Sequence, residues 1–222
     1  DSSQSRGLGD VYKRQPMSSQ LEALKIELVK GYEKLPDADL YVIGNALSRG
    51  NPSVERILEE NLDYISGPEM LGTIIKSKKV IAVSGTHGKT TVSAMTASIL
   101  QSKYGDVGYL IGGVLGDGSW SARLGSNEYF IVEADEYDSA FFDKRSKFIH
   151  YFPNILAINN IEFDHADIFD DLTPILKQFS HLLRTIPANG QVVFHENDQT
   201  TKHLVDKENW FDVYSIGNDK QF

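Results

Sequence analysis

The fold of this chain is decided by Val80-Ile81-Ala82-Val83-Ser84-Gly85-Thr86-His87-Gly88-Lys89-Thr90-Thr91. Four apolar residues, three of them β-branched, lead into a Gly-x-x-Gly-Lys-Thr-Thr turn, and a helical pattern follows at once. Glycines in such a turn permit backbone angles and close approaches that a side chain would block. The amides and the dipole of a helix N-terminus favour an anion. The stretch therefore predicts a strand, a phosphate-binding loop and a helix.

The side chains of this loop also suit phosphate chemistry. Lys89 supplies a mobile cation for the β- and γ-phosphates of a nucleotide, and the Thr90 hydroxyl stands where a Mg²⁺ ligand is needed. The strict form of the loop has a further glycine where this chain has Val83, so the loop is a shortened relative of it. The alternative is a glycine-rich turn with a surface lysine. The order of strand, loop and helix favours phosphate binding.

Composition limits the class of protein. A chain of 222 residues with 41% hydrophobic and 24% charged residues is typical of one large or two small globular domains. A net charge of −9 argues against nucleic acid as a partner. Without cysteine the chain has no disulfide, thiolate metal site or cysteine nucleophile, which favours the cytoplasm. No apolar run approaches the roughly 20 residues of a membrane span. Nothing in the sequence indicates the oligomeric state.

The apolar and polar patterns predict two α/β regions. Residues 1–15 match neither a helix nor a strand, and we interpret them as a non-native or disordered lead. Residues 16–72 are expected to form a truncated first domain, with a helix over 21–29, a strand over 39–44 and a helix capped by Ser53. Residues 66–79 are interpreted as the passage to a second domain.

The second domain, residues 73–222, shows strands that alternate with helices. Strands are predicted at 79–84, 108–111, 128–133, 155–159, 191–194 and 212–216, and helices at 89–102 and 172–185. This order predicts an α/β fold, a doubly wound, mostly parallel sheet with helices on both faces.

Further polar groups follow the predicted strands. Glu133-Ala134-Asp135-Glu136 comes directly after a buried strand, and carboxylates this close need a cation, for which Mg²⁺ is suited. A solvated acidic loop is the alternative. His165 follows another strand and is either a ligand of metal or phosphate or a structural histidine. Gly112 and Gly113 either admit a sugar or phosphate or turn the chain. Ser48 and Arg49 either contact a ligand or shape their turn.

Three of these motifs together resemble those of the Mur ligases, the ATP-dependent amide-bond ligases of bacterial peptidoglycan precursor synthesis. Val83–Thr91 resembles the ATP loop of the family, Glu133–Glu136 its magnesium-binding acidic motif, and Asn160–His165 its Asn-x-x-x-Asp-His motif. The motifs occur in the order of the family, and the resemblance runs from about residue 16 to the end of the chain.

The resemblance implies a partial Rossmann-like UDP-sugar domain over 16–72, a central ATP domain over 73–222 and the absence of the C-terminal domain. It implies catalytic roles for Lys89 and His165, and Mg²⁺ ligation by Thr90, Glu133 and His165. The residues implied to contact ATP are Gly85, Thr86, His87, Gly88, Lys89, Thr90, Thr91 and Asn160. Ser48, Arg49, Gly112 and Gly113 are the implied substrate contacts.

The implied reaction is the phosphorylation of UDP-N-acetylmuramate by ATP, followed by attack of an amine on the acyl phosphate. Within the family the chain is most similar to the branch that uses the murein tripeptide L-alanyl-γ-D-glutamyl-meso-diaminopimelate in peptidoglycan recycling. A ligase that adds L-alanine to the same UDP-sugar, and a nucleotide-binding module without catalysis, are the alternatives. Because the third domain is missing, we expect this chain by itself to form no amide.

Overall fold

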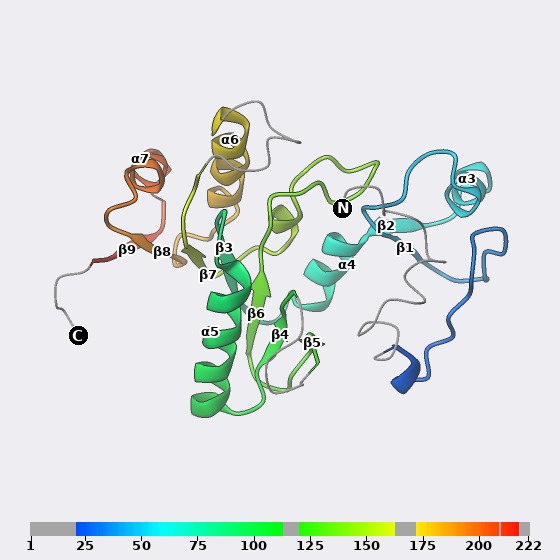
Figure 1. The fold of residues 1–222 in the computed structure, drawn as a ribbon, viewed down its shortest axis with the longest axis horizontal. Coiled ribbons are helices and arrows are strands. Elements are labelled where there is room, and N and C mark those ends of the chain that lie inside the picture. Colours follow the sequence, from blue (N-terminus) through cyan, green and yellow to red (C-terminus); the bar gives the residue numbers. More distant parts are fainter. Residues whose placement is uncertain (1–20, 113–119, 163–171, 209, 218–222) are drawn as a thin grey trace. The chain divides into compact units, whose positions relative to one another are not determined.

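The computed structural model describes residues 21–112, 120–162, 172–208 and 210–217. The chain divides into two compact units, drawn in Figure 1. The first unit comprises residues 1–70 and 138–144, and the second comprises residues 71–137 and 145–222. No helix in the part of the chain that the structure describes has the length and apolar character needed to cross a membrane.

The first unit is a small α/β layer. Strand β1 (Tyr41–Ile43) pairs in parallel with β2 (Tyr64–Ser66), and α3 (Pro52–Glu59) connects them. Its core residues are Ile43, Val54 and Ile57, against which Leu35, Tyr41, Leu47, Leu58, Leu62 and Phe141 pack. The last of these comes from the separate segment 138–144, so this segment completes the core of the first unit.

The cap of α3 differs from the prediction. Asn51 is the capping residue, and its side-chain oxygen accepts hydrogen bonds from the amides of Ser53 at 3.1 Å and Val54 at 3.2 Å. Pro52 begins the helix, a position where a missing N–H does no harm. The Ser53 hydroxyl instead donates to the carbonyl of Tyr32 at 2.7 Å. The prediction of Ser53 as the cap was therefore wrong by two residues.

The predicted helix over 21–29 was also wrong for most of its length. Only residues 21–23 of the predicted helix over 21–29 are helical in the described part, and Lys25 has a positive φ of 58°. A left-handed residue ends a helix because it turns the backbone away from the axis. The predicted passage over 66–79 contains helix α4 (Gly67–Ile74), which begins in the first unit and ends in the second.

A single sheet organises the second unit. In its described part, seven strands lie in the order β5-β4-β6-β3-β7-β8-β9, and all neighbours are parallel except β4 and β5. The strands are β3 (Lys79–Ser84), β4 (Gly108–Leu110), β5 (Ala122–Arg123), β6 (Tyr129–Glu133), β7 (Ile155–Ile158), β8 (Gln191–His195) and β9 (Asp212–Ile216). The helices are α5 (Lys89–Tyr104), η2 (Lys147–His150), α6 (Leu172–Leu183) and α7 (Gln199–Lys207).

The two faces of this sheet have separate cores, because side chains alternate along each strand. Ile81 of β3 and Ile131 of β6 pack with Ala97 on one face. Helix α5, which carries Ala97, covers that face (Figure 1). Ala82 of β3 packs on the other face, in the cluster that includes Phe179 of α6 and residues of α7 and η2. Helices therefore cover both faces, and the predicted doubly wound α/β fold is confirmed.

Strand β3 lies at the point where the direction of the chain reverses. From β3 the chain continues through α5 to β4 on the β6 side, whereas β7, β8 and β9 lie on the other side of β3. Val83 is in register with Glu133 of β6, and Ser84 with Ile158 of β7. Ligands of open parallel sheets bind at the carboxyl ends of the strands beside such a reversal. The topology therefore brings the ends of three strands to the glycine loop.

Candidate functional site

The glycine loop needs glycine at positions 85 and 88 for steric reasons. Gly85 has a φ of +127° and Gly88 a φ of +77°, which other residues rarely adopt. A Cβ added at Gly85 would lie 2.7 Å from the carbonyl oxygen and 2.9 Å from the nitrogen of Asn160. One added at Gly88 would lie 2.6 Å from the side-chain nitrogen of Asn159. The loop after β7 therefore packs directly against the backbone of the glycine loop.

Hydrogen bonds join these two loops as well. The amide of Thr86 donates to the Asn160 carbonyl at 2.9 Å, and the amide of His87 donates to the Asn160 side chain at 2.9 Å. The side chain of Asn159 donates to the His87 carbonyl at 2.6 Å. The Thr86 hydroxyl accepts from the Glu162 amide at 2.9 Å and donates to its carbonyl at 3.1 Å. Asn160, predicted to contact ATP, thus braces the loop.

Asn159 and Glu162 were not among the predicted site residues. The available signal was the Asn-Asn pair directly after a predicted strand, because an amide side chain both donates and accepts hydrogen bonds. The pairing itself was not readable from the sequence, since the braced residues lie more than 70 positions away, as the separations of 72, 73 and 76 residues show.

Helix α5 begins directly at the end of the loop. Among the described residues no side chain caps it at Gly88. The first amides of a helix have no partner within the helix, so the amides of its first turn, where Thr90 and Thr91 lie, are available to an anion. The Lys89 ammonium donates to the carbonyl oxygens of Gly85 at 2.7 Å and Thr86 at 3.3 Å. The cation therefore lies over its own loop.

Two of the three predicted metal ligands, Thr90 and Glu133, meet beside this helix start. The Thr90 hydroxyl donates to one Glu133 carboxylate oxygen at 2.8 Å, and the Gly112 amide donates to the other at 2.7 Å. Glu133 ends β6, which pairs with β3, so neighbouring strands hold the carboxylate at the loop. A carboxylate and a hydroxyl are oxygen ligands of the kind that Mg²⁺ prefers, and the donor set fits that ion. Gly112, predicted to contact substrate, orients Glu133.

Asp135, two residues after Glu133, forms an ion pair with Lys147. The Asp135 carboxylate accepts from the Lys147 ammonium of η2 at 3.3 Å. Burial raises the pKa of Asp135, and the nearby charges of Lys147 and Lys89 oppose that effect. The carboxyl end of β6 is therefore a region of buried charge with both signs present. Lys147 was not predicted, because a lysine after a polar loop is ordinarily a solvated side chain.

Two predicted residues, Gly113 and His165, lie outside the described residues. The roles predicted for them in substrate contact, metal binding and catalysis therefore stay predictions.

Two hollows lie next to the loop at the carboxyl ends of β7 and β8. One has a volume of about 420 Å³ and is mostly polar, and the other has a volume of about 230 Å³. The first is lined by Asn159, Asn160, Ile161, Glu162, His195, Asn197, Asp198, Gln199 and Thr200. The second is lined by Val92, Ala157, Ile158, Asn159, Val193, Phe194, His195 and Ile216. Both include Asn159 and His195, so the hollows adjoin each other and the loop.

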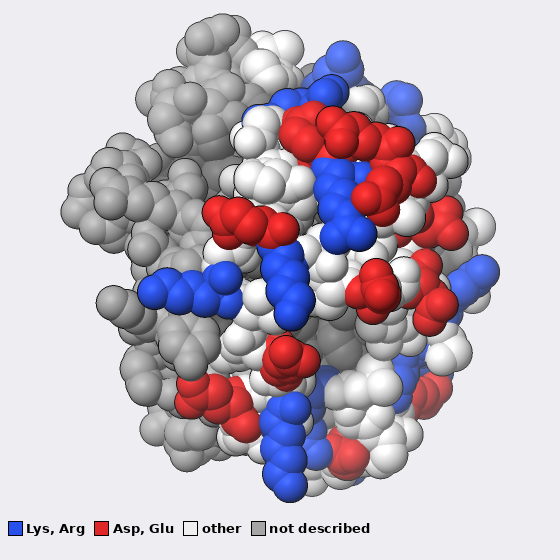
Figure 2. Space-filling model, turned by 90° about the vertical axis from the view of Figure 1, so that its right-hand side faces the viewer, with Lys and Arg blue, Asp and Glu red and all other residues white. Residues whose placement is uncertain are grey.

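In the first unit, the structure gives Arg49 an internal partner. Its guanidinium donates to both Glu55 oxygens, at 2.9 Å and 3.3 Å from Nε and at 2.9 Å from the terminal nitrogen. Ser48 lies exposed in the same turn. Acidic and basic side chains are interspersed over the described part of the face drawn in Figure 2. Arg56 forms a similar exposed pair with Glu60. Arg49 shapes its turn, and its predicted substrate contact stays a prediction.

The Arg49–Glu55 pair leads to a prediction for titration. Hydrogen bonds from Arg49 and from the Gly50 amide lower the pKa of Glu55 to about 2. Because folding lowers the pKa of Glu55, its ionised carboxylate stabilises the folded state. This stabilisation is fully present above the ordinary pKa of 4.5 and is lost as the pH falls toward about 2. We expect NMR titration to give a Glu55 midpoint near 2 and Arg49→Gln to raise it. Arg56→Gln, which removes the partner of Glu60, should leave it unchanged.

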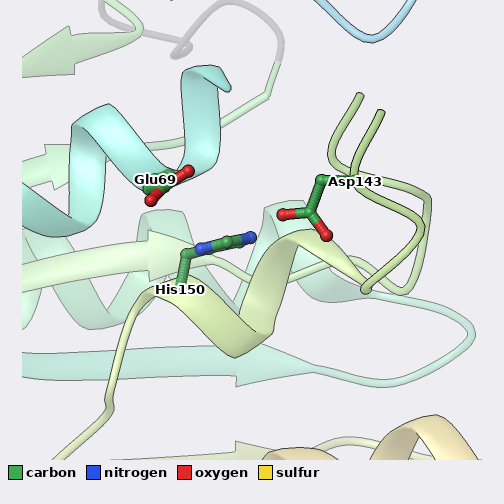
Figure 3. A group of neighbouring side chains, drawn as sticks. All are labelled: Glu69, Asp143 and His150. Atoms are coloured by element: carbon green, nitrogen blue, oxygen red, sulfur yellow. The ribbon is translucent and has the colours of Figure 1, made fainter. Parts of the chain in front are cut away.

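Two carboxylates of the first unit also lie close together. Glu69, in the first turn of α4, and Asp143, in the segment 138–144, have oxygens within 4.8 Å of each other (Figure 3). His150, which Figure 3 also labels, belongs to the second unit and lies in η2. The carbonyl oxygen of His150 occupies the space that a Cβ at position 72 would need, which explains why α4 has a glycine there. None of these residues was predicted as part of a site.

The sequence matches two protein-family models, and it is similar to known proteins. The Mur ligase middle domain matches residues 83–222, and the Mur ligase family catalytic domain matches residues 6–79. The UDP-N-acetylmuramate–L-alanyl-γ-D-glutamyl-meso-2,6-diaminoheptandioate ligase of Escherichia coli K12 is 50% identical over 206 residues, which cover 91% of this chain and 45% of that protein. A UDP-N-acetylmuramate–L-alanine ligase of Clostridium botulinum (strain Kyoto) is 32% identical, over 90% of this chain and 43% of that protein.

The structure is also similar to a solved structure of a ligase from another organism. The UDP-N-acetylmuramate:L-alanyl-γ-D-glutamyl-meso-diaminopimelate ligase from Neisseria meningitides has a TM-score of 0.83 and 45% identity, over 90% of this chain and 66% of that one. The chain spans about half the length of the curated relatives it matches. The alanine-adding ligase is thus the more distant of these relatives in sequence.

Proposed function

This chain belongs to the Mur ligase family, and from that membership we propose that it serves an ATP-dependent ligase that joins UDP-N-acetylmuramate to L-alanyl-γ-D-glutamyl-meso-diaminopimelate. Its greater identity to ligases with that name than to an alanine-adding ligase favours the tripeptide as acceptor. The proposal includes a UDP-sugar domain over 16–72, an ATP domain over 73–222 and a cytoplasmic location.

One observation carries the nucleotide-binding part of this proposal. The Thr90 hydroxyl, in the first turn of α5, meets the Glu133 carboxylate, at the end of β6, where the helix amides and Lys89 supply positive charge. We propose that Thr90 and Glu133 hold Mg²⁺ and that His165 takes part in a second metal or phosphate contact. Mg²⁺ bound there would neutralise and orient the phosphates of ATP.

The residues of the chain address the main obstacle to the proposed reaction, which is the approach of two anions. The lactyl carboxylate of the UDP-sugar must reach the terminal phosphate of ATP. Phosphoryl transfer depends chiefly on positioning and on charge stabilisation. The α5 amides and the Lys89 ammonium would offset this repulsion, while Asn159 and Asn160 hold the loop in shape. We propose that the nucleoside extends from the loop into the hollows beside β7 and β8, which share Asn159 with the residues that brace the loop.

Removal of the Lys89 charge is expected to weaken nucleotide binding. Contacts to charged groups contribute about 1.5–3 kcal/mol each, so Lys89→Ala should raise the Kd for Mg-ATP by roughly 10- to 150-fold. Isothermal titration calorimetry of the wild type and the variant measures this. Lys103→Ala, at the other end of α5, is the control and should bind as the wild type does. Equal affinities of Lys89→Ala and the wild type would reject the phosphate-binding role.

The acceptor is tested by a product assay on the natural full-length protein. It is supplied with Mg-ATP, UDP-N-acetylmuramate and either the tripeptide or L-alanine, and products are identified by mass spectrometry. We expect the UDP-muramyl-tripeptide. Product from L-alanine alone would support the alanine-adding ligase, and ATP binding without product from either amine would support a non-catalytic nucleotide-binding module.

A further inference from the structure

The Lys89 side chain has a neighbour from the predicted acidic motif for which no individual role was predicted. This neighbour is Glu136, whose Oε2 lies 3.9 Å from the Lys89 Nζ. The side chain of Lys89 is 12% exposed and that of Glu136 is 4% exposed. The pair is therefore almost completely removed from water, unlike the surface ion pairs of the chain.

Burial gives this contact its importance. A carboxylate taken out of water is strongly destabilising unless a positive charge or hydrogen bonds compensate it. The Lys89 ammonium also needs compensation. The carbonyl oxygens of Gly85 and Thr86 accept hydrogen bonds from it but carry no net charge, so they cannot neutralise the ammonium. The carboxylate of Glu136 can, and the two charges thus compensate each other inside the second unit.

The neighbouring acidic residues are held by other groups. Glu133 accepts from Thr90 and Gly112, and Asp135 accepts from Lys147. The three carboxylates at the end of β6 therefore have three different sets of contacts, and the contact with Lys89 belongs to Glu136. This division distinguishes Glu136 from a member of an undifferentiated acidic cluster.

We propose that Glu136 is a positioning residue for Lys89: it holds the ammonium over the loop and keeps it directed there when phosphate oxygens replace the carbonyl contacts. The proposal rests on the proposed function, because the phosphates are those of the bound nucleotide. An ammonium held in place before binding loses less conformational freedom when the ligand arrives, which raises affinity. Glu136 acts through Lys89 and need not contact the nucleotide.

A double-variant cycle on the full chain tests this coupling in two ways. Without nucleotide, Lys89→Met leaves the Glu136 carboxylate buried beside an apolar side chain, so the thermal unfolding midpoint should fall. Adding Glu136→Gln to that variant should restore part of the loss. With Mg-ATP, Glu136→Gln alone should raise the Kd about tenfold, whereas the double variant should bind no more weakly than Lys89→Met alone.

Two further variants make the result specific. Glu136→Asp keeps the charge but withdraws it from Lys89, so its Kd should lie between those of the wild type and Glu136→Gln, and it remains informative if Glu136→Gln does not fold. Asp138→Asn removes the exposed partner of Lys144 two residues further along and should change neither the midpoint nor the Kd. A Kd for Glu136→Asp as weak as that for Glu136→Gln would count against the proposal.

The outcomes separate this inference from the proposed function. Independent, additive effects of Lys89→Met and Glu136→Gln on the Kd, or no recovery of the unfolding midpoint in the double variant, would overturn the role of Glu136. A wild-type chain that does not bind Mg-ATP would reject the nucleotide-binding function instead. The unfolding measurements need no nucleotide, so they decide whether the buried pair couples the two residues in either case.

Discussion

Gly85→Ala is expected to raise the Kd for Mg-ATP by about 200-fold or more. The φ of +127° is one that an alanine adopts only with strain, which costs about 1–3 kcal/mol. The added methyl would also lie 2.7 Å and 2.9 Å from backbone atoms of Asn160. Because backbone atoms cannot rotate away as a side chain can, the two loops must separate. The amides would then lose the arrangement that suits phosphate.

Calorimetric titration with Mg-ATP measures this effect, with circular dichroism as a check that the sheet persists. Gly88→Ala should be milder, because its added methyl meets the end of the Asn159 side chain, which can move. Gly44→Ala is the matched control, since nothing lies within 4 Å of the methyl that it adds. A Gly85→Ala chain that binds Mg-ATP as tightly as the wild type would show that the loop geometry does not matter for binding.

Glu133→Gln should produce the second large effect, a loss of affinity of about 100-fold that appears only with Mg²⁺. The amide has nearly the shape of the carboxylate but lacks its charge, and Mg²⁺ prefers charged oxygen ligands. The Gly112 amide and the Thr90 hydroxyl both donate to the carboxylate of Glu133. In the variant, the NH₂ group would replace one of the two accepting oxygens and would face one of these donors. Binding of ATP in EDTA should change little, because removal of a negative charge does not disfavour an anion.

Titrations with Mg-ATP and with ATP in EDTA provide the two measurements. Glu128→Gln is the matched control, because Glu128 directly precedes β6 at the end opposite Glu133 and pairs with Lys79 at the surface. It should leave both affinities unchanged. Equal losses for Glu133→Gln with and without Mg²⁺ would contradict a metal-binding role and indicate a general disturbance of the loop.

The strand, loop and helix from residue 79 onward were predictable because local chemistry determines them. A β-branched run favours a strand, and glycines allow the left-handed turn that a helix can follow. The parallel sheet was predictable as well, since apolar strands that alternate with helices have few other arrangements. Predictions were less successful for the short elements. Asn51 rather than Ser53 caps α3. Helix α4 was not predicted. Short segments carry little periodicity, so tertiary packing decides them.

The sequence by itself determined which chemical groups stand at the ends of the strands: the glycines and Lys89 after β3, and Glu133 after β6. Only the tertiary structure decided their partners. The strand order placed Glu133 against Thr90 and Gly112, turned Asn159 and Asn160 onto the loop, and buried Glu136 beside Lys89. The physical reason is that a side chain's type and its place on a strand are local properties. Which strands become neighbours depends on how the whole chain buries its apolar faces.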